Sequence, residues 1–294
     1  MDLNEYQSAA LATEQVPAVK DSEEIVPLLG LAGEAGQLLS EYKKHLRDGD
    51  AHQLFPERVA EELGDILWYV ASAGARFGFD LNTIAEKNLH KAKESWSGRL
   101  SGYQPVGAPY IFDADFPEHE RFPRKFSVTL EEFEEDGQVK VRGLTNYGKK
   151  VGQDLTDNAF EEDGYRFHDV FHFACIAALG WSPVSRRNLE LKRRSDPRVD
   201  EVEDGGRATV IEEGVTALVF SYAINHAWLQ GVSAVDHDLI RTIKNMTAHL
   251  EVVSVTTGDW ERTILMGYEV WRQVLSKRGG VVNLDLDRRL LSID

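Results

Sequence analysis

Two stretches of the chain, GLAGEAGQL at residues 30–38 and AEELGDILWY at residues 60–69, carry the pattern from which the fold can be inferred. Each lies in a longer segment, 25–46 and 56–77, whose apolar residues recur at helical spacing. A third segment of this kind follows them. Residues 1–100 are therefore predicted to fold as a bundle of helices.

The same two stretches bring oxygen-bearing side chains onto one face of each predicted helix. Residues three apart share a helix face, so Glu34 and Gln37 point the same way. Glu62 and Asp65 are related in the same manner. If the two helices pack antiparallel, the four side chains converge, and clustered carboxylates in a low dielectric need a cation. Hard oxygen ligands of this kind suit Mg²⁺ or Mn²⁺.

Glycine residues beside the carboxylates add to the pattern. Gly33, Gly36 and Gly64 each cost a helix about 1 kcal/mol relative to alanine, which suggests a close approach by a partner helix or a phosphate. The alternative is that the acids lie on a solvated helix face. The acids stand inside apolar stretches at matched spacing, and on these features alone both interpretations remain open.

At these residues the sequence resembles the MazG-type all-α nucleoside triphosphate pyrophosphohydrolases, relatives of the dimeric dUTPases and the dCTP pyrophosphatases. The signature of that family is E-x-x-E followed, after a spacer, by E-x-x-D. Here the first motif reads Glu34-x-x-Gln37, and Glu62-x-x-Asp65 follows after 24 residues. The segment IAEKNLHK at residues 84–91 resembles a further helix motif of the family.

The resemblance covers about residues 1–98 and implies an enzyme that hydrolyses a nucleoside triphosphate to the monophosphate and pyrophosphate. The catalytic residues that it implies are Glu34, Glu62 and Asp65. With Gln37 they form the implied binding site for Mg²⁺ or Mn²⁺. The expected fold of this part is a MazG-like helical bundle.

The residues expected to contact the nucleotide lie on the three predicted helices. The resemblance implies that Asn88 and Lys91 hold the triphosphate. Tyr69 stands about one turn after Asp65 and faces the same side, where phosphate or sugar would lie. Lys44 is a further candidate for a phosphate contact.

The sequence departs from the family pattern at Gln37, where the family usually has glutamate. A neutral amide offers an oxygen but no charge, so affinity for a second ion is expected to fall. Glu41 shares that face, about 10 Å from Glu34 along the axis, so it would serve a different ion or support the ligands without contacting the ion. The alternative to an active enzyme is a nucleotide-binding sensor or regulatory protein with weak or no turnover. A third interpretation is a structural helical module with surface acids.

After the predicted bundle the pattern changes. Four of the nine prolines fall within residues 105–123, which is typical of a linker. Apolar residues then alternate in 126–133 and 139–144 on either side of an Asp-Gly pair, which predicts a β-hairpin. We expect residues 101–150 to form a proline-rich linker with this hairpin, and residues 151–294 to form a second, all-α domain. The expected fold class is therefore mainly α.

The C-terminal half carries a second candidate site. His168 and His172 are four residues apart, so they share a helix face at a spacing that can bind a metal ion. Asp169 lies between them, and Glu212 and Glu213 are candidate partners from another helix. The alternative is a hydrogen-bonded histidine pair at the edge of the core.

Composition limits the partners. The chain has 33 basic and 49 acidic residues and a net charge of −16, so non-specific nucleic-acid binding is not expected. A basic run at residues 186–194 is interpreted either as a contact for phosphate or a nucleic-acid end, or as the partner of the acids at 201–204. No apolar run approaches the ~20 residues of a membrane span. The single cysteine fits a reducing compartment, so a cytoplasmic location is expected.

The predicted N-terminal bundle has too few helices to enclose a site by itself. We therefore expect a homodimer that completes the bundle, or coverage of the site by helices of the C-terminal domain. The expected small-molecule partner is the nucleoside triphosphate substrate.

Overall fold

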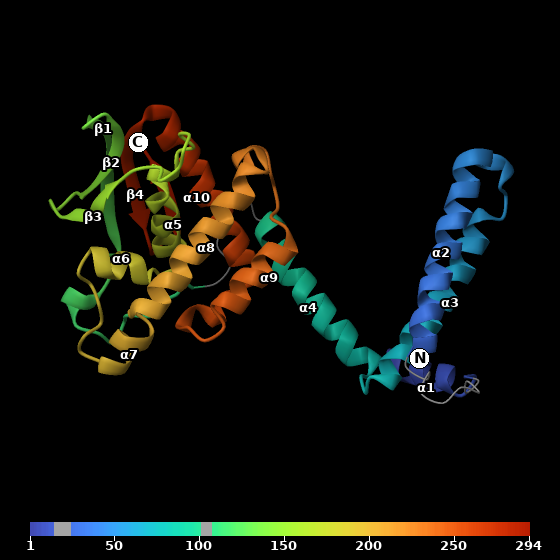
Figure 1. Cartoon of the computed structure of the whole chain (residues 1–294). Helices are drawn as coiled ribbons and strands as arrows, with labels where there is room; N and C mark the ends of the chain where they lie inside the picture. Colours follow the sequence, from blue (N-terminus) through green and yellow to red (C-terminus); the bar gives the residue numbers. More distant parts are fainter. Residues whose placement is uncertain (15–24, 101–107) are drawn as a thin grey trace. The chain divides into compact units, whose positions relative to one another are not determined.

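The computed structural model describes the backbone of residues 1–14, 25–100 and 108–294, and the side chains of these residues except 90, 91 and 93–100. The chain divides into two compact units, Met1–Lys93 and Glu94–Asp294 (Figure 1). These are called the N-terminal unit and the C-terminal unit below.

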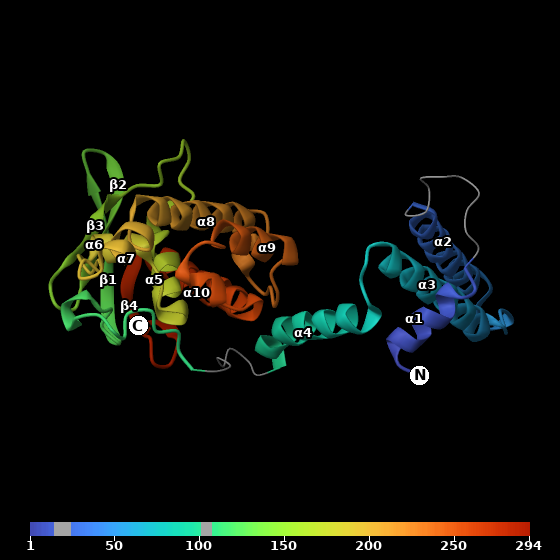
Figure 2. The same ribbon diagram turned by 90° about the horizontal axis from the view of Figure 1, so that it is seen from below.

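The N-terminal unit consists of helices that match the predicted periodicity. Helices α2 (Ile25–Asp48) and α3 (Phe55–Arg76) lie side by side as a hairpin, α1 (Leu3–Leu11) packs against α3, and α4 begins after it (Leu81–Leu100) (Figures 1 and 2). Pro56 stands in the first turn of α3, where its missing N–H costs no hydrogen bond. The bounds of α2 and α3 agree with the predicted helices to within two residues.

The apolar core of the N-terminal unit is small. Its buried cluster consists of Ala10, Ala71 and Leu81. By contrast, Leu39 is 70% exposed and Leu63 is 50% exposed. The hairpin of α2 and α3 therefore leaves large apolar side chains uncovered by the described residues of the N-terminal unit.

The C-terminal unit contains a five-stranded antiparallel sheet in the order β3-β2-β1-β4-β5. Its strands are β1 (Lys125–Glu135), β2 (Gln138–Thr145), β3 (Lys150–Leu155), β4 (Gly279–Asp285) and β5 (Leu290–Ile293). The first three strands and the last two thus come from opposite ends of the unit.

The sheet corrects the predicted fold class. The β-hairpin forms as expected, with Glu135 paired with Gln138 across the turn. It is not a linker, however, because β1 also pairs with β4 from Lys125–Asp285 to Glu131–Gly279. The all-α C-terminal domain was therefore a wrong prediction. The alternation in VVNLDL at residues 281–286 is a strand signal that the helical interpretation overlooked.

One face of the sheet carries the core of the C-terminal unit. Helices α5 (Asp169–Leu179) and α10 (Thr257–Lys277) pack against the sheet and against each other (Figures 1 and 2). Every residue of α5 is buried, since it lies between the sheet and the outer helices. The remaining helices are α6 (Pro183–Asn188), α7 (Pro197–Val202), α8 (Gly206–Ile224) and α9 (His237–Met246). Within the described ranges, no helix has the length and hydropathy that crossing a membrane requires.

Candidate functional site

The helical hairpin of the N-terminal unit brings the predicted carboxylates together. Glu34 of α2 and Glu62 and Asp65 of α3 each offer an oxygen, and these oxygens lie within 4.8 Å of one another. Gln37 donates a hydrogen bond from Nε2 to Oε2 of Glu34, with a distance of 2.6 Å. The four residues predicted to converge therefore do so across α2 and α3.

The environment of Glu62 fits a bound cation. Its side chain is 9% exposed, and Oε2 has no hydrogen-bond partner among the described residues. Burial raises the pKa of Glu62, and the negative charges of Glu34 and Asp65 raise it further. Such a cluster is stabilised by a proton or a cation, and an all-oxygen donor set suits Mg²⁺ or Mn²⁺.

A pocket of about 480 Å³ adjoins this cluster and includes Gln37 and Glu62 in its wall. Lys44, one of the predicted phosphate contacts, also lines it. The Lys44 ammonium donates to Oε1 of Glu41, and Nε2 of His52 lies 3.3 Å from Oε2 of the same carboxylate. The carboxylate of Glu41 is therefore paired with the Lys44 ammonium, and it does not join the group of three acids whose oxygens cluster.

Two basic residues of the pocket, Arg58 and His52, were not predicted from the sequence. Arg58 lines the wall and stands one helical turn before Glu62, a spacing that could have revealed it. Its Nη1 lies 2.7 Å from Oε2 of Glu61. His52 comes from the connection between α2 and α3, where no periodicity points to a site. Together with Lys44, these residues place basic groups beside the carboxylates.

The other predicted substrate contacts lie elsewhere. The ring of Tyr69 lies against the backbone of Gly30 and does not line the pocket that contains Lys44. Asn88 is exposed on α4 and does not line that pocket. The side chain of Lys91 lies outside the described residues.

The space beside each of the three glycines next to the acids is unoccupied by described atoms of the chain. A Cβ atom built at Gly33, Gly36 or Gly64 would meet no described atom within 4 Å. No other described helix of the N-terminal unit approaches them closely. The space that a side chain would fill next to the carboxylates is thus free for a ligand or a second molecule.

The second predicted group of residues also converges, in the C-terminal unit. His168 and His172 at the start of α5 and Glu213 of α8 offer ligand atoms within 4.8 Å of one another. Asp169 stands at the edge of this group, with Oδ1 3.8 Å from Nε2 of His168. Burial acts to lower the pKa of His172, but the charge and hydrogen bond of Glu212 outweigh it and raise the pKa to about 10.

Part of the basic run at residues 186–194 is buried in the C-terminal unit. Arg186 and Arg193 are each 1% exposed. Arg193 pairs with Asp204 at 2.7 Å and with Glu251 at 2.8 Å, and Arg186 pairs with Asp113 at 2.9 Å. Of the acids at 201–204, Asp204 takes part as predicted, 2.7 Å from Arg193 and 3.7 Å from Arg186, whereas Asp113 and Glu251 lie outside that predicted set.

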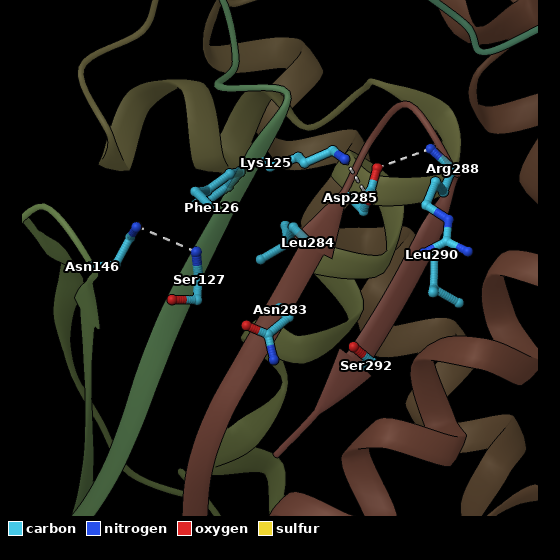
Figure 3. Close-up of a pocket in the computed structure, with 10 residues that line it drawn as sticks. All are labelled: Lys125, Phe126, Ser127, Asn146, Asn283, Leu284, Asp285, Arg288, Leu290 and Ser292. Atoms are coloured by element: carbon cyan, nitrogen blue, oxygen red, sulfur yellow. Dashed lines mark hydrogen bonds and ion pairs between the residues drawn. The ribbon is translucent and has the colours of Figure 1, made fainter.

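A further pocket of about 390 Å³ lies on the sheet among β1, β4 and β5 (Figure 3). Within it, Nζ of Lys125 lies 3.3 Å from Oδ2 of Asp285, and the backbone N–H of Arg288 donates to the same carboxylate. Ser127 donates from its backbone to Oδ1 of Asn146 at the other end. None of the predicted site residues lines it.

Comparisons with known proteins extend this description. The family model of the MazG C-terminal domain matches residues 107–294. The Gene 37 protein of Mycobacterium phage L5 is 37% identical to this chain over 97 residues, which cover 31% of this chain and 85% of that protein. No solved structure matches the chain.

Proposed function

The chain belongs to the MazG C-terminal domain family, and we propose that it hydrolyses a nucleoside triphosphate to the monophosphate and pyrophosphate. One observation carries the proposal. The buried carboxylate of Glu62 lies in a cluster with Glu34 and Asp65 and has an oxygen without a hydrogen-bond partner among the described residues. The family match spans residues 107–294, so support for the reaction comes from the N-terminal unit and from its resemblance to MazG-type enzymes.

The donor set of the cluster supports a role in binding Mg²⁺ or Mn²⁺. Glu34, Glu62 and Asp65 would hold the ion, because each offers an oxygen at the meeting point of α2 and α3. An ion bound there would neutralise phosphate oxygens and stabilise the charge that develops on them in the transition state. Gln37 orients Glu34 by donating to its Oε2.

The neighbouring pocket supports the binding of a phosphate chain. Lys44 and Arg58 contribute positive charge to its wall, and Glu62 links the wall to the carboxylate cluster. A triphosphate that lies along this wall would contact both cations while its oxygens reach the carboxylate-bound ion. One carboxylate of the cluster would orient the attacking water toward the α-phosphorus.

A second copy of the chain completes the proposed site. Leu39 and Leu63 are exposed on the two helices that carry the carboxylates, and exposed apolar surface of this kind favours association. We place the reaction in the cytoplasm of the cell. The single cysteine, Cys175, is free and buried, as a reducing compartment allows.

The test is pyrophosphate release from a panel of canonical and modified nucleoside triphosphates, with Mg²⁺ or Mn²⁺ present. Glu62→Gln keeps the shape of the side chain but removes its charge, and we expect it to lower the rate by about 100-fold or more. Glu57→Gln is the matched control, because Glu57 lies exposed in the first turn of the same helix. Equal release by wild type and Glu62→Gln would overturn the proposal.

A measurement of protein stability shows whether a lower rate in the variant comes from the lost catalytic group or from a damaged fold. Glu62→Gln removes the repulsion between the buried Glu62 carboxylate and the carboxylates of Glu34 and Asp65, so the metal-free variant should be at least as stable as wild type. Hydrogen exchange of α2 and α3 measures this locally. Tight nucleotide binding by wild type without pyrophosphate release would favour a sensor and contradict the proposed hydrolysis.

A further inference from the structure

We propose that His168, His172 and Glu213 of the C-terminal unit form a second metal site, one that binds a divalent transition-metal ion such as Zn²⁺. This group shares no residue with the carboxylate cluster of the N-terminal unit. The inference does not depend on the proposed hydrolysis.

The three donors come from two elements that the fold holds together. His168 immediately precedes α5, His172 lies four residues later, and Glu213 extends from α8. Their ligand atoms lie within 4.8 Å of one another. The two imidazole rings meet edge to face, with centroids 5.7 Å apart. A single ion can contact three donors at this spacing with small side-chain adjustments.

The hydrogen bonds of His172 leave one ring nitrogen free to bind a metal ion. Its Nδ1 lies 2.7 Å from Oε1 of Glu212, and since a carboxylate only accepts, Nδ1 carries the proton. In the neutral ring, Nε2 then holds the lone pair. His172 is 1% exposed, and Nε2 has no hydrogen-bond partner among the described residues. Oε2 of Glu213 lies 3.6 Å from it.

His168 is oriented in the same way. Its Nδ1 lies 2.8 Å from the carbonyl oxygen of Tyr165, which accepts the ring proton and leaves Nε2 with the lone pair of the neutral ring. The Tyr165 ring stacks on the imidazole, with centroids 4.4 Å apart, and so restricts its rotation. In both histidines Nδ1 is therefore bonded to the protein, and Nε2 is the nitrogen at which a metal ion would replace any proton.

Glu212 provides the support that metal-binding histidines commonly have. A carboxylate that accepts from the far ring nitrogen fixes the orientation of the imidazole and raises its basicity. Glu212 is 0% exposed, and its other oxygen accepts a hydrogen bond of 2.8 Å from the backbone N–H of Val184. The adjacent residues Glu212 and Glu213 thus face His172 from two sides.

The donor chemistry selects the class of ion. Two imidazole nitrogens and one carboxylate oxygen suit Zn²⁺ and similar transition metals, whereas Mg²⁺ and Ca²⁺ prefer oxygen ligands throughout. The side chain of Glu213 is 40% exposed, so the site opens to solvent on that side. An ion there would keep coordination positions for water or a substrate.

The competing interpretation is an internal ion pair, in which a protonated His172 lies between Glu212 and Glu213. It accounts for the two carboxylates but assigns no role to the orientation of His168. A metal ion and a proton compete for the same Nε2 atom, so metal binding distinguishes the two interpretations directly.

The test uses the full chain with Glu62→Gln, which removes the carboxylate site from the measurement. The protein is stripped with a chelator, and Zn²⁺ binding is measured by calorimetry, with Mg²⁺ as the comparison ion. We expect one Zn²⁺ per chain and far weaker Mg²⁺ binding. Co²⁺ in place of Zn²⁺ should give absorption bands typical of nitrogen ligation.

Adding Glu213→Gln or His168→Gln should weaken Zn²⁺ binding at least tenfold. Glu213 is half-exposed, so its variant should keep the fold, which circular dichroism verifies. His226→Gln is the matched control, because its Nδ1 also bonds a backbone carbonyl, that of Tyr222, at 2.7 Å. Absence of Zn²⁺ binding to the Glu62→Gln protein, or equal binding after Glu213→Gln, would overturn the site and leave the ion pair.

Discussion

The ring of Tyr69 on α3 occupies the space in which a side chain at Gly30 on α2 would begin. A Cβ atom at residue 30 would lie 2.1 Å from Cε1 of Tyr69, far inside van der Waals contact. The absence of a side chain at Gly30 therefore sets how closely the two carboxylate-bearing helices approach. Because Gly30 has no side chain, the Tyr69 ring can lie directly against α2.

Gly30→Ala should destabilise the helical hairpin. The new methyl group forces the Tyr69 ring or the helices apart, and overpacking of this kind costs about 1–3 kcal/mol. Hydrogen exchange of α2 and α3 in the native protein measures the loss. Gly36→Ala is the control on the same helix, because a Cβ atom there meets nothing within 4 Å. It should stabilise the helix by up to about 1 kcal/mol, and equal destabilisation by both changes would contradict the packing argument.

Gln37→Glu should tighten divalent-ion binding. The change adds a fourth carboxylate next to Glu34, whose Oε2 now accepts a hydrogen bond from Gln37. More negative charge attracts the ion more strongly, so Mn²⁺ affinity measured by calorimetry should rise about tenfold. Without metal, the added repulsion should lower the stability of the hairpin. Unchanged Mn²⁺ affinity would mean that residue 37 lies outside the ion's coordination sphere.

Arg193→Met should strongly destabilise the C-terminal unit. The guanidinium is 1% exposed and bonds Asp204, Glu251 and the carbonyl oxygen of Phe112. Its removal takes the guanidinium away from the carboxylates of Asp204 and Glu251, and breaking a buried ion pair in this way costs about 3–5 kcal/mol. Urea unfolding followed by tryptophan fluorescence measures the change.

Arg194→Met provides the matched control for this prediction. Arg194 is adjacent in the sequence but exposed, and surface substitutions of this kind change stability by about 0.5 kcal/mol or less. Similar losses of stability for both variants would contradict the assignment of the effect to the buried ion pairs of Arg193.

Asp154 should make a pH-dependent contribution to the stability of the sheet. Arg142 lies 2.9 Å and Lys150 2.8 Å from its carboxylate oxygens. The hydrogen bond from Arg142, followed by that from Lys150, holds the pKa of Asp154 well below its ordinary value of 3.8. The ion pairs therefore stabilise the fold fully above that pH, and this stabilisation is lost as the pH falls below it.

Asp154→Asn removes this dependence. The stability difference between wild type and variant should be about 1 kcal/mol at neutral pH, since the pair is near the surface. It should shrink when urea unfolding is repeated at about pH 3 and below. If the stability difference between wild type and Asp154→Asn does not change with pH, the contribution of Asp154 comes from packing rather than from charge.

The sequence by itself determined the local features of the site. The bounds of α2 and α3 and the shared face of Glu34 with Gln37 follow from helical periodicity, which depends only on residues within a turn. The same holds for the hairpin of β1 and β2, because the Asp-Gly turn and the alternation around it are contiguous. The spacing of His168 and His172 is equally local.

Tertiary structure alone decided how distant segments combine. Alternation of apolar and polar residues predicts a strand but not the strand with which it pairs. The pairing of β1 with β4 could therefore not be inferred from the sequence. For the same reason, the mixed α and β character of the C-terminal unit could not be inferred. The sequence also could not show that Glu212 accepts a hydrogen bond from Nδ1 of His172 while Glu213 lies near Nε2. Such contacts depend on the packing of α5 against α8, a property of chain segments about 40 residues apart rather than of either helix.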